Sequence, residues 1–236
     1  LEANPRASRT MPFVSKVTGN QIIKAGTLLM LGHSLDSIKK TTNYLNSSTN
    51  KVAIKKAIFP WSRFPAEDTM LGPEMKATGE VLGIGRSFGV ALNKAYAAAG
   101  VEINENEKGI FVSLSDQEKP NFIKIVKTYS DLGFKIYSTY GTGEYLKNND
   151  INSTIVGRAD ETFPTSLTIL QDKLISLVIN TPTFANEYTD GWKIRRLSHE
   201  TGVAVVSSVR EAEAFLKAFL ETTKSFEDME AIQNVS

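Results

Sequence analysis

Residues 135–142 read KIYSTYGT, an alternating apolar run that ends in small hydroxyl residues and a glycine. Helix-favouring residues follow at 144–146, so the sequence predicts a strand that breaks sharply into a helix. At such a junction the first N–H groups of the helix point out of the carboxyl end of the strand, where they favour an anion. The hydroxyl groups of Thr139 and Thr142 add donors there. Ordinary helix capping by threonine is the alternative interpretation.

Strand and helix patterns alternate regularly around this stretch. Strands are expected at residues 109–114, 134–138, 153–156, 174–179 and 203–206. Helices are expected around residues 122–132, at 144–147, 163–171 and 192–199, and after a capping box at 208–211. Five such units predict an α/β fold with a doubly wound five-stranded parallel sheet. Ligands of such sheets bind at the carboxyl ends of the strands, which is where residues 139–142 fall.

Polar side chains follow four of the expected strands. They are Ser113 and Lys119, then Thr139, Tyr140, Gly141 and Thr142, then Arg158, and last Asn180, Thr181 and Thr183. Two cations, several hydroxyls, an amide and a helix N-terminus suit a phosphorylated small molecule. The set has no obvious general base, since Asp190 lies further along the chain and His199 is expected to be structural. A solvated loop surface is the alternative for each residue singly, but convergence from four strand ends argues against it for the set.

The first part of the chain is less regular. Helices are expected within residues 10–32, with Gly19 and Gly32 as stops, and another is expected to start at 34–36. An exposed loop is expected at 41–50 and a strand at 51–59; a short strand at 80–85 then leads to a helix capped by Ser87 and ended by Gly100. The charged stretch 102–108 is the candidate linker. We therefore expect an α+β piece at residues 1–104 and the regular domain at residues 105–236.

Composition narrows the class of protein. The 236 residues are 41% hydrophobic and carry a net charge of +1, which is typical of a globular protein and not of a nucleic-acid binder. No apolar run approaches a membrane span and no signal peptide is evident. Cysteine is absent, which excludes thiolate metal sites and a Cys nucleophile and makes the reducing cytoplasm the default compartment. Two histidines argue against a His-based metal cluster. Because the chain starts at Leu1, it is interpreted as a piece of something longer.

The first residues carry a different signal. On an extended chain the side chains of Glu2 and Asn4 point to one side, with Arg6 nearby. Carboxylate and amide oxygens beside a guanidinium suit a hard divalent ion that bridges nucleotide phosphates. The same five residues also fit a surface turn before Pro5.

Longer motifs carry a specific resemblance. They are residues 2–10 (EANPRASRT), 12–19 (PFVSKVTG), 71–75 (LGPEM) and 78–81 (TGEV), with Gly85 and Arg86. They resemble the closing part of the second ATP-grasp unit in the large subunit of carbamoyl-phosphate synthase. The domain after Lys108 resembles the C-terminal regulatory domain of that subunit, which has the methylglyoxal-synthase-like fold. The resemblance implies a ligase that makes carbamoyl phosphate from bicarbonate, glutamine-derived ammonia and two ATP, for pyrimidine and arginine synthesis.

By this resemblance, Glu2 and Asn4 match ligands of the Mg or Mn ion on ATP, and Arg6 matches a residue of the same phosphate site. The rest of the ATP-grasp unit would lie upstream of Leu1, so the piece alone is expected to be inactive. Its partners would be the rest of the large subunit and the glutaminase small subunit.

The resemblance also implies an effector site for UMP as inhibitor or IMP as activator. The matching positions are Ser113, Lys119, Thr139, Thr142, Asn180 and Thr183. At Arg158 the enterobacterial pattern has lysine, so the charge is kept and the donor geometry changes; Pro182 replaces a hydroxyl residue. We expect the phosphate on residues 139–142 with the Lys119 ammonium nearby, because neither has another evident partner in the sequence.

Control by ornithine is not expected. The family's acidic ligand falls on Lys56 here, and its Tyr-x-Thr falls on Val205, Val206 and Ser207. A cation at residue 56 would repel an ammonium ligand.

Two other functions stay open. One is a free lyase of the methylglyoxal-synthase type, which eliminates phosphate from a triose phosphate and needs carboxylates in its pocket. Residues 180–184 carry no acid, and residues 1–108 would go unexplained. The other is a phosphometabolite-binding module with no enzyme behind it.

Overall fold

The structure of the protein is a computed structural model that describes residues 3, 5–42, 50–64, 68–69, 75, 79–101, 109–158, 161, 164–181 and 189–222. Its helices are α1 (Thr10–Thr18), α2 (Ile22–Met30), α3 (Leu35–Thr41), α4 (Phe88–Ala98), α5 (Lys119–Asp131), α6 (Tyr140–Lys147), α7 (Ser166–Gln171), α8 (Asp190–Thr201) and α9 (Val209–Thr222), with a 3₁₀ helix η1 (Trp61–Arg63). Its strands are β1 (Val52–Ile58), β2 (Gly79–Gly85), β3 (Gly109–Ser113), β4 (Lys135–Ser138), β5 (Thr154–Ile155), β6 (Leu177–Asn180) and β7 (Ala204–Val206).

The strands after residue 109 form a five-stranded sheet in the order β5-β4-β3-β6-β7, and all its pairs are parallel. The chain starts in the middle at β3, winds outward to β5, and then returns to the other side of β3. The strand order therefore reverses between β3 and β6, where the last residues of these strands, Ser113 and Asn180, are register partners. This topology confirms the predicted doubly wound α/β fold, in which ligands bind beside such a reversal.

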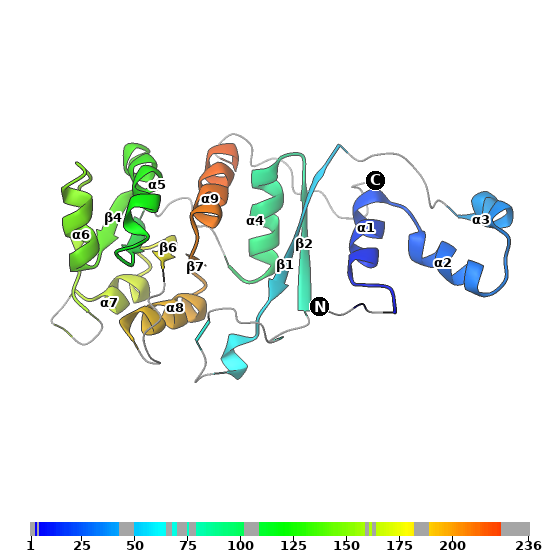
Figure 1. Ribbon diagram of the computed structural model, residues 1–236, viewed down its shortest axis with the longest axis horizontal. Helices are drawn as coiled ribbons and strands as arrows, with labels where there is room; N and C mark the ends of the chain where they lie inside the picture. The colour runs from blue at the N-terminus through cyan, green and yellow to red at the C-terminus, as the bar shows by residue number, and fades with distance from the viewer. Residues whose placement is uncertain are drawn as a thin grey trace.

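Helices cover both faces of this sheet (Figure 1). Successive side chains of a strand point to opposite faces. Ile110 and Val112 of β3 accordingly pack with α5 and α9, whereas Phe111 packs with α7 and α8. Every strand residue of β3 except Ser113 is fully buried, as expected for the central strand of a sheet covered on two sides.

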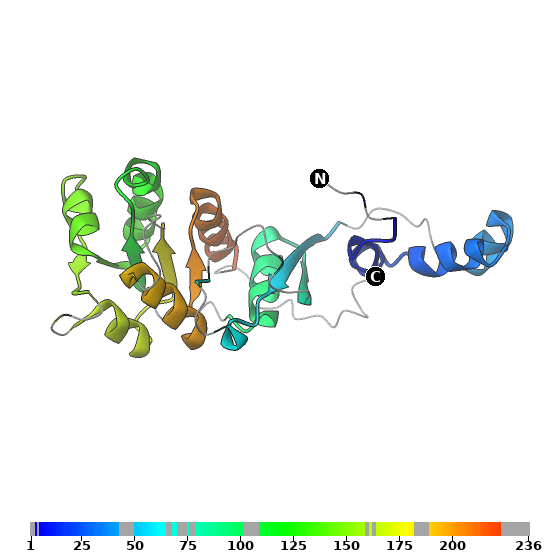
Figure 2. The same ribbon diagram turned by 60° about the horizontal axis from the view of Figure 1, so that its bottom comes forward.

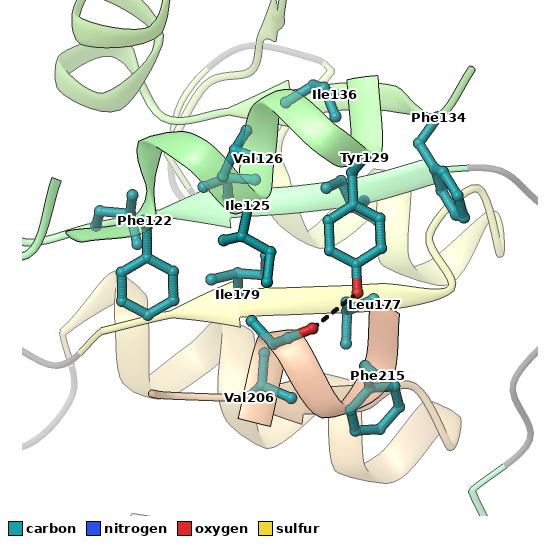
Figure 3. Packing of buried hydrophobic residues seen from close by; sticks show 14 of the residues in the cluster. Phe122, Ile125, Val126, Tyr129, Phe134, Ile136, Leu177, Ile179, Val206 and Phe215 are labelled. Carbon is teal, nitrogen blue, oxygen red and sulfur yellow. Dashed lines mark hydrogen bonds between the residues drawn. The ribbon is translucent and has the colours of Figure 1, made fainter. Parts of the chain in front are cut away.

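On the face of the sheet covered by α5 and α9, Tyr129 joins these two helices. Figure 3 shows its ring among the apolar side chains between α5 and α9, and its hydroxyl donates to the carbonyl oxygen of Ala212 at 3.2 Å. The ring also meets the edge of Phe134 at a centroid distance of 5.2 Å. Burial raises the pKa of the Tyr129 hydroxyl. A buried phenol needs such a partner, so the bond fixes α9 against α5.

The earlier part of the chain forms a separate antiparallel pair, β1 and β2, covered by α4. A Cβ atom at Gly83 would lie 2.1 Å from the carbonyl oxygen of Ala91, so α4 rests directly on the backbone of β2. Helices α1, α2 and α3 lie at the end of the molecule away from the five-stranded sheet, with β1, β2 and α4 between (Figure 2). Residues 102–108 lie outside the described residues, so the division of the chain at 104 and 105 stays a prediction.

Most element predictions agree with the structure, with one informative shift. Gly19, Gly32 and Gly100 have the positive φ angles of helix stops, and Ser87 accepts a hydrogen bond from the N–H of Val90. Helix α6, however, begins at Tyr140 rather than at residue 144. The expected turn is thus the first turn of the helix itself. Most of the loop expected at 41–50, residues 43–49, lies outside the described residues.

Candidate functional site

The carboxyl ends of β3 and β6 are tied together by hydrogen bonds. The N–H of Thr181 donates to the carbonyl oxygen of Ser113 at 3.1 Å, and the N–H of Ser115 donates to the Thr181 hydroxyl at 2.8 Å. The side chain of Thr181 is therefore engaged in holding the two strand ends, and it is buried together with Asn180.

The turn from β4 into α6 is held by Thr142. Its hydroxyl, in a residue only 1% exposed, accepts from the N–H of Leu114 at 3.0 Å and from the Thr139 hydroxyl at 3.2 Å. Thr139 precedes the helix with extended backbone but makes no side-chain capping bond, so the alternative of ordinary capping is not realised. The structure gives the backbone N–H groups of Tyr140, Gly141 and Thr142 no acceptor among the residues that it describes. These groups are the orphan donors of a helix start.

The Lys119 ammonium lies over the same turn. It is 3.8 Å from where a Cβ atom of Gly141 would stand, and its side chain is only 11% exposed. The expectation that it has no partner was wrong, because its Nζ atom lies 2.5 Å from the Oδ1 atom of Asp116. The hydrogen bond from Lys119 holds the pKa of the Asp116 carboxyl below its usual range. Asp116 itself is exposed, and nothing in the spacing of the two residues had singled it out.

A pocket of about 480 Å³ opens beside this turn. It is lined by Thr139, Tyr140, Gly141, Val156, Arg158, Glu161 and Asp190. The Nε atom of Arg158 lies 3.8 Å from Asp190 Oδ2, and its backbone N–H donates to Glu161 Oε2 at 2.9 Å. Asp190 was not expected at the site, because it follows the end of β6 by ten residues. Helix α8 starts at Asp190 and returns that carboxylate to the pocket.

The predicted site residues thus fall into three groups. Thr139, Tyr140, Gly141 and Arg158 line the pocket. Lys119 lies over the turn beside the pocket and Thr142 belongs to that turn, but neither lines the pocket, whereas Ser113, Asn180 and Thr181 occupy the neighbouring strand ends. Thr183 lies outside the described residues.

Asn180 is held by a residue that sequence reasoning missed. Nη1 of Arg195, in α8, donates to Asn180 Oδ1 at 2.6 Å. The same guanidinium donates from Nε to Asp68 Oδ1 at 2.9 Å and from Nη2 to Asp68 Oδ2. Arg195 is 6% exposed, so this is a bidentate ion pair between a buried arginine of α8 and a partly exposed aspartate in the first part of the chain.

The predicted metal ligands Glu2 and Asn4 lie outside the described residues. Arg6 is exposed and donates to the carbonyl oxygen of Ala7 at 3.4 Å. A second pocket of about 240 Å³ lies nearby without including Arg6; it is lined by Arg9, Pro12, Phe13, Lys16, Lys55, Glu80, Val81 and Leu82. Among the described residues, no group of three or more His, Asp or Glu side chains could hold a metal ion.

Lys56 is a half-buried cation. Its Nζ atom lies 4.0 Å from the ring centroid of Tyr96, and burial lowers the pKa of Lys56 while the charge of Glu211 opposes that shift. Ser207 donates its backbone N–H to Glu211 at 3.0 Å. The Lys56 ammonium, Tyr96 and Glu211 therefore lie close together, and the absence of control by ornithine stays a prediction.

No helix in the described part of the chain has both the length and the apolar character needed to cross a membrane. A family model described as MGS-like domain matches residues 121–207. Over 99% of this chain, 38% of residues are identical to the carbamoyl phosphate synthase large chain of Nostoc sp.. The identity is 37% over 97% of the chain for the C-terminal section of that large chain from Aquifex aeolicus, and 36% over 96% for the section from Methanocaldococcus jannaschii.

The matched stretch spans only 21% of the Nostoc large chain, and 45% and 38% of the two separate C-terminal sections. The likeness nevertheless extends over nearly the whole of this chain and includes the MGS-like domain that holds the pocket. The chain therefore belongs to the carbamoyl phosphate synthase large-chain family.

Proposed function

We propose that this chain is the regulatory portion of a carbamoyl phosphate synthase and that its pocket binds a nucleoside monophosphate, UMP or IMP. The observation that carries the proposal is the start of α6. Three backbone N–H groups there lack an acceptor among the described residues, and the Lys119 ammonium lies over the same turn. Helix N-termini favour dianions both through these donors and through the helix dipole.

The pocket also suits the rest of such a ligand. Its volume of about 480 Å³ falls within the range of about 300 to 1,000 Å³ found for small-molecule sites. Arg158 also lines the pocket, is 73% exposed and can reach a phosphate oxygen or the sugar. The carboxylates of Glu161 and Asp190 accept hydrogen bonds and therefore suit hydroxyl groups, which a nucleotide carries on its ribose.

Both cations at this edge already have carboxylate partners. Lys119 pairs with Asp116, and Arg158 pairs with Asp190. In each pair one side chain is largely exposed, Asp116 at 93% and Arg158 at 73%, and exposed pairs contribute little free energy. A phosphate dianion that also meets the α6 N–H groups would therefore displace the carboxylates from the cations.

For the whole protein, we propose the activity that the relatives' name states, feeding pyrimidine and arginine synthesis in the cytoplasm. Glu2 and Asn4 would hold Mg or Mn on ATP and Arg6 would bind its phosphates, with the rest of the large subunit and a glutaminase subunit as partners. Without an upstream ATP-binding half, the 236-residue chain would form no carbamoyl phosphate from carbamate and ATP. Turnover by the purified chain above a heat-killed control contradicts this.

The effector proposal is tested by calorimetric titration of UMP, IMP and ornithine into the chain at fixed ionic strength. Lys119→Ala removes a charge-assisted contact worth about 1.5 to 3 kcal/mol, so nucleotide affinity is expected to fall about tenfold or more. Lys127→Ala, an exposed lysine two turns further along α5, is the matched control and should leave affinity unchanged. Equal affinities for wild type and Lys119→Ala would place the phosphate elsewhere.

One observation favours a second candidate function, that of the phosphate-eliminating lyase. Asp190 and Glu161 line the pocket, so carboxylates are present there although residues 180–184 carry none. Such a lyase would convert dihydroxyacetone phosphate to methylglyoxal and phosphate, and Asp190→Asn would abolish the reaction. The pairing of Asp190 with Arg158 at 3.8 Å favours the binding function, because this carboxylate already has a cationic partner in the pocket. Absence of phosphate release from the triose phosphate would eliminate the lyase.

A further inference from the structure

Arg195 sets the orientation of the Asn180 amide. A guanidinium has only donors, so the amide oxygen of Asn180 must face Arg195 Nη1, at 2.6 Å. The NH₂ group of the same amide must then point away from Arg195. Asn180 is the last residue of β6 and the register partner of Ser113, so the amide lies at the strand ends beside the reversal of the sheet.

The guanidinium and the amide are packed closely beneath the first turn of α8. A Cβ atom at Gly191 would lie 3.1 Å from Arg195 Nη1 and within 3.7 Å of both terminal atoms of the Asn180 amide. Gly191 directly follows Asp190, which lines the pocket. Asn180 is 2% exposed and Arg195 6%, so both side chains are enclosed by the protein.

The other side of Arg195 is held by a distant part of the chain. Asp68 accepts from both Nε and Nη2, and a two-point contact of this kind fixes the plane of a guanidinium. The neighbouring Arg196 also reaches the first part of the chain, where its Nη1 donates to the carbonyl oxygen of Phe64 at 2.8 Å. Both arginines thus connect α8 to residues 64 and 68, but only Arg195 also contacts Asn180.

We propose that Arg195 is a positioning residue that couples the strand-end site to the preceding region through Asp68. While Asp68 holds the guanidinium, the Asn180 amide presents its NH₂ group as a donor to an anionic or hydroxyl-bearing ligand. When Asp68 withdraws, Arg195 loses its fixed plane and the amide loses its orientation. Coupling between two sites is reciprocal, so a ligand that bonds to the oriented amide also stabilises the Asp68 contact. The ligand in this scheme rests on the proposed function; the orientation of the amide does not.

The orientation is tested without any ligand. In ¹⁵N-labelled protein, the side-chain NH₂ signals of Asn180, assigned by their loss in Asn180→Asp, are expected to shift or broaden in Asp68→Asn, Asp68→Glu and Arg195→Lys. Arg196→Lys breaks a contact between the same two regions and is the matched control, in which the signals should stay in place. Two Asp68 variants guard against one that fails to fold. Unchanged Asn180 signals in a folded Asp68 variant would overturn the proposal, as would equal changes in Arg196→Lys.

The coupling is then tested by titration of UMP. Asp68→Asn and Arg195→Lys are expected to weaken binding about five- to tenfold, and Arg196→Lys less than twofold. Equal affinity in wild type and Asp68→Asn would overturn the coupling. If wild type binds neither UMP nor IMP, the proposed function fails, and the amide signals then decide the Arg195 proposal alone.

Discussion

Two charged pairs beside the pocket differ in exposure from the ion pair in the seam, the contact between α8 and residues 61–64 and 68. At the pocket, Asp116 is 93% and Arg158 73% exposed at the side chain. In the seam, the Arg195 side chain is 7% exposed and Asp68 32%. Exposed pairs contribute little and exchange readily for another anion, whereas a buried arginine cannot lose its carboxylate without a large penalty. The cations at the edge of the sheet can therefore exchange their carboxylates for another anion, whereas Arg195 in the seam keeps its carboxylate.

Beside the seam, apolar and backbone contacts join α4 to α9. Tyr96 of α4 meets the edge of Phe215 of α9 at a centroid distance of 4.6 Å. The carboxylate of Glu221, near the end of α9, accepts from the N–H of Gly89 at 2.6 Å, which satisfies a donor at the start of α4. The two sheets do not share a strand, yet helices α4 and α9 join them.

The largest expected effect is at Asp68. Asp68→Ala leaves the guanidinium of Arg195 buried without its carboxylate, and we expect the free energy of unfolding to fall by about 3 to 4 kcal/mol. Urea denaturation at pH 7 measures it. Asp36→Ala is the control, since Asp36 is 89% exposed in its pair with Lys39 and should change stability by less than about 0.5 kcal/mol. Similar losses in both variants would mean that the seam pair is no different from a surface pair.

The second expected effect is a dependence of stability on pH that comes from His199, also in the seam. Burial, with the nearby charges of Lys56 and Arg196, lowers the pKa of His199 from 6.5 to about 4. The unfolded chain therefore takes up this proton near pH 6.5 and the folded chain only near pH 4. Its contribution to stability is full above pH 6.5 and is lost as the pH falls from about 6.5 to about 4.

His199→Gln should remove this loss, which amounts to at most about 3 kcal/mol. The measurement is the difference in unfolding free energy between pH 7 and pH 4.5. The exposed His33, replaced in the same way, serves as control. A pH profile unchanged by His199→Gln would show that other groups dominate acid destabilisation.

The sequence predicted the edge of the sheet better than the seam, and the reason is physical. Thr139, Gly141 and Arg158 each follow a strand, and strand ends of a parallel sheet meet at one edge whatever the details. The caps at Ser87 and Ser208 were likewise local signals, confirmed by the hydrogen bonds that these hydroxyls accept from the N–H groups of Val90 and Glu211. Arg195 and Asp68 are 127 positions apart, and no sequence pattern around either residue predicts the contact.

The start of α6 shows a different limit. Two glycines in Tyr140-Gly141-Thr142-Gly143 favour a turn by local propensity, so the helix was expected later. Tertiary packing prevails, because a Cβ atom at Gly143 would lie 2.7 Å from Ser138 Oγ and 2.8 Å from Ile155 Cγ1. Gly143 thus lets α6 lie close to β4 and β5, which aims its N–H groups at the pocket.

The third expected effect concerns the close packing of α4 against α9. A Cβ atom at Gly89 would lie 2.9 Å from the carbonyl oxygen and 3.0 Å from the Cα atom of Ala218. Gly89→Ala is therefore expected to push α4 from α9 and lower the free energy of unfolding by about 2 kcal/mol. Gly26→Ala, in α2 with open space around the new methyl, should be neutral or stabilise by up to about 1 kcal/mol. Thermal unfolding of both variants compares them, and equal midpoints would argue that the helix contact is loose.

The smallest expected effect is at Asp116, beside the pocket. Its removal is expected to raise nucleotide affinity, whereas Lys119→Ala is expected to lower it. Asp116 is exposed and engages the Lys119 ammonium at 2.5 Å, so it competes with a phosphate for that cation. Asp116→Ala should leave the unfolding midpoint unchanged within error, because exposed pairs contribute little. It should raise UMP affinity about two- to threefold, by freeing Lys119 and removing a negative charge beside the site. Asp131→Ala, at the other end of α5, is the control for the change in net charge. A loss of affinity in Asp116→Ala would show that the carboxylate holds Lys119 in place for the ligand, as Asp68 holds Arg195, and the contrast between edge and seam would then fail at this pair.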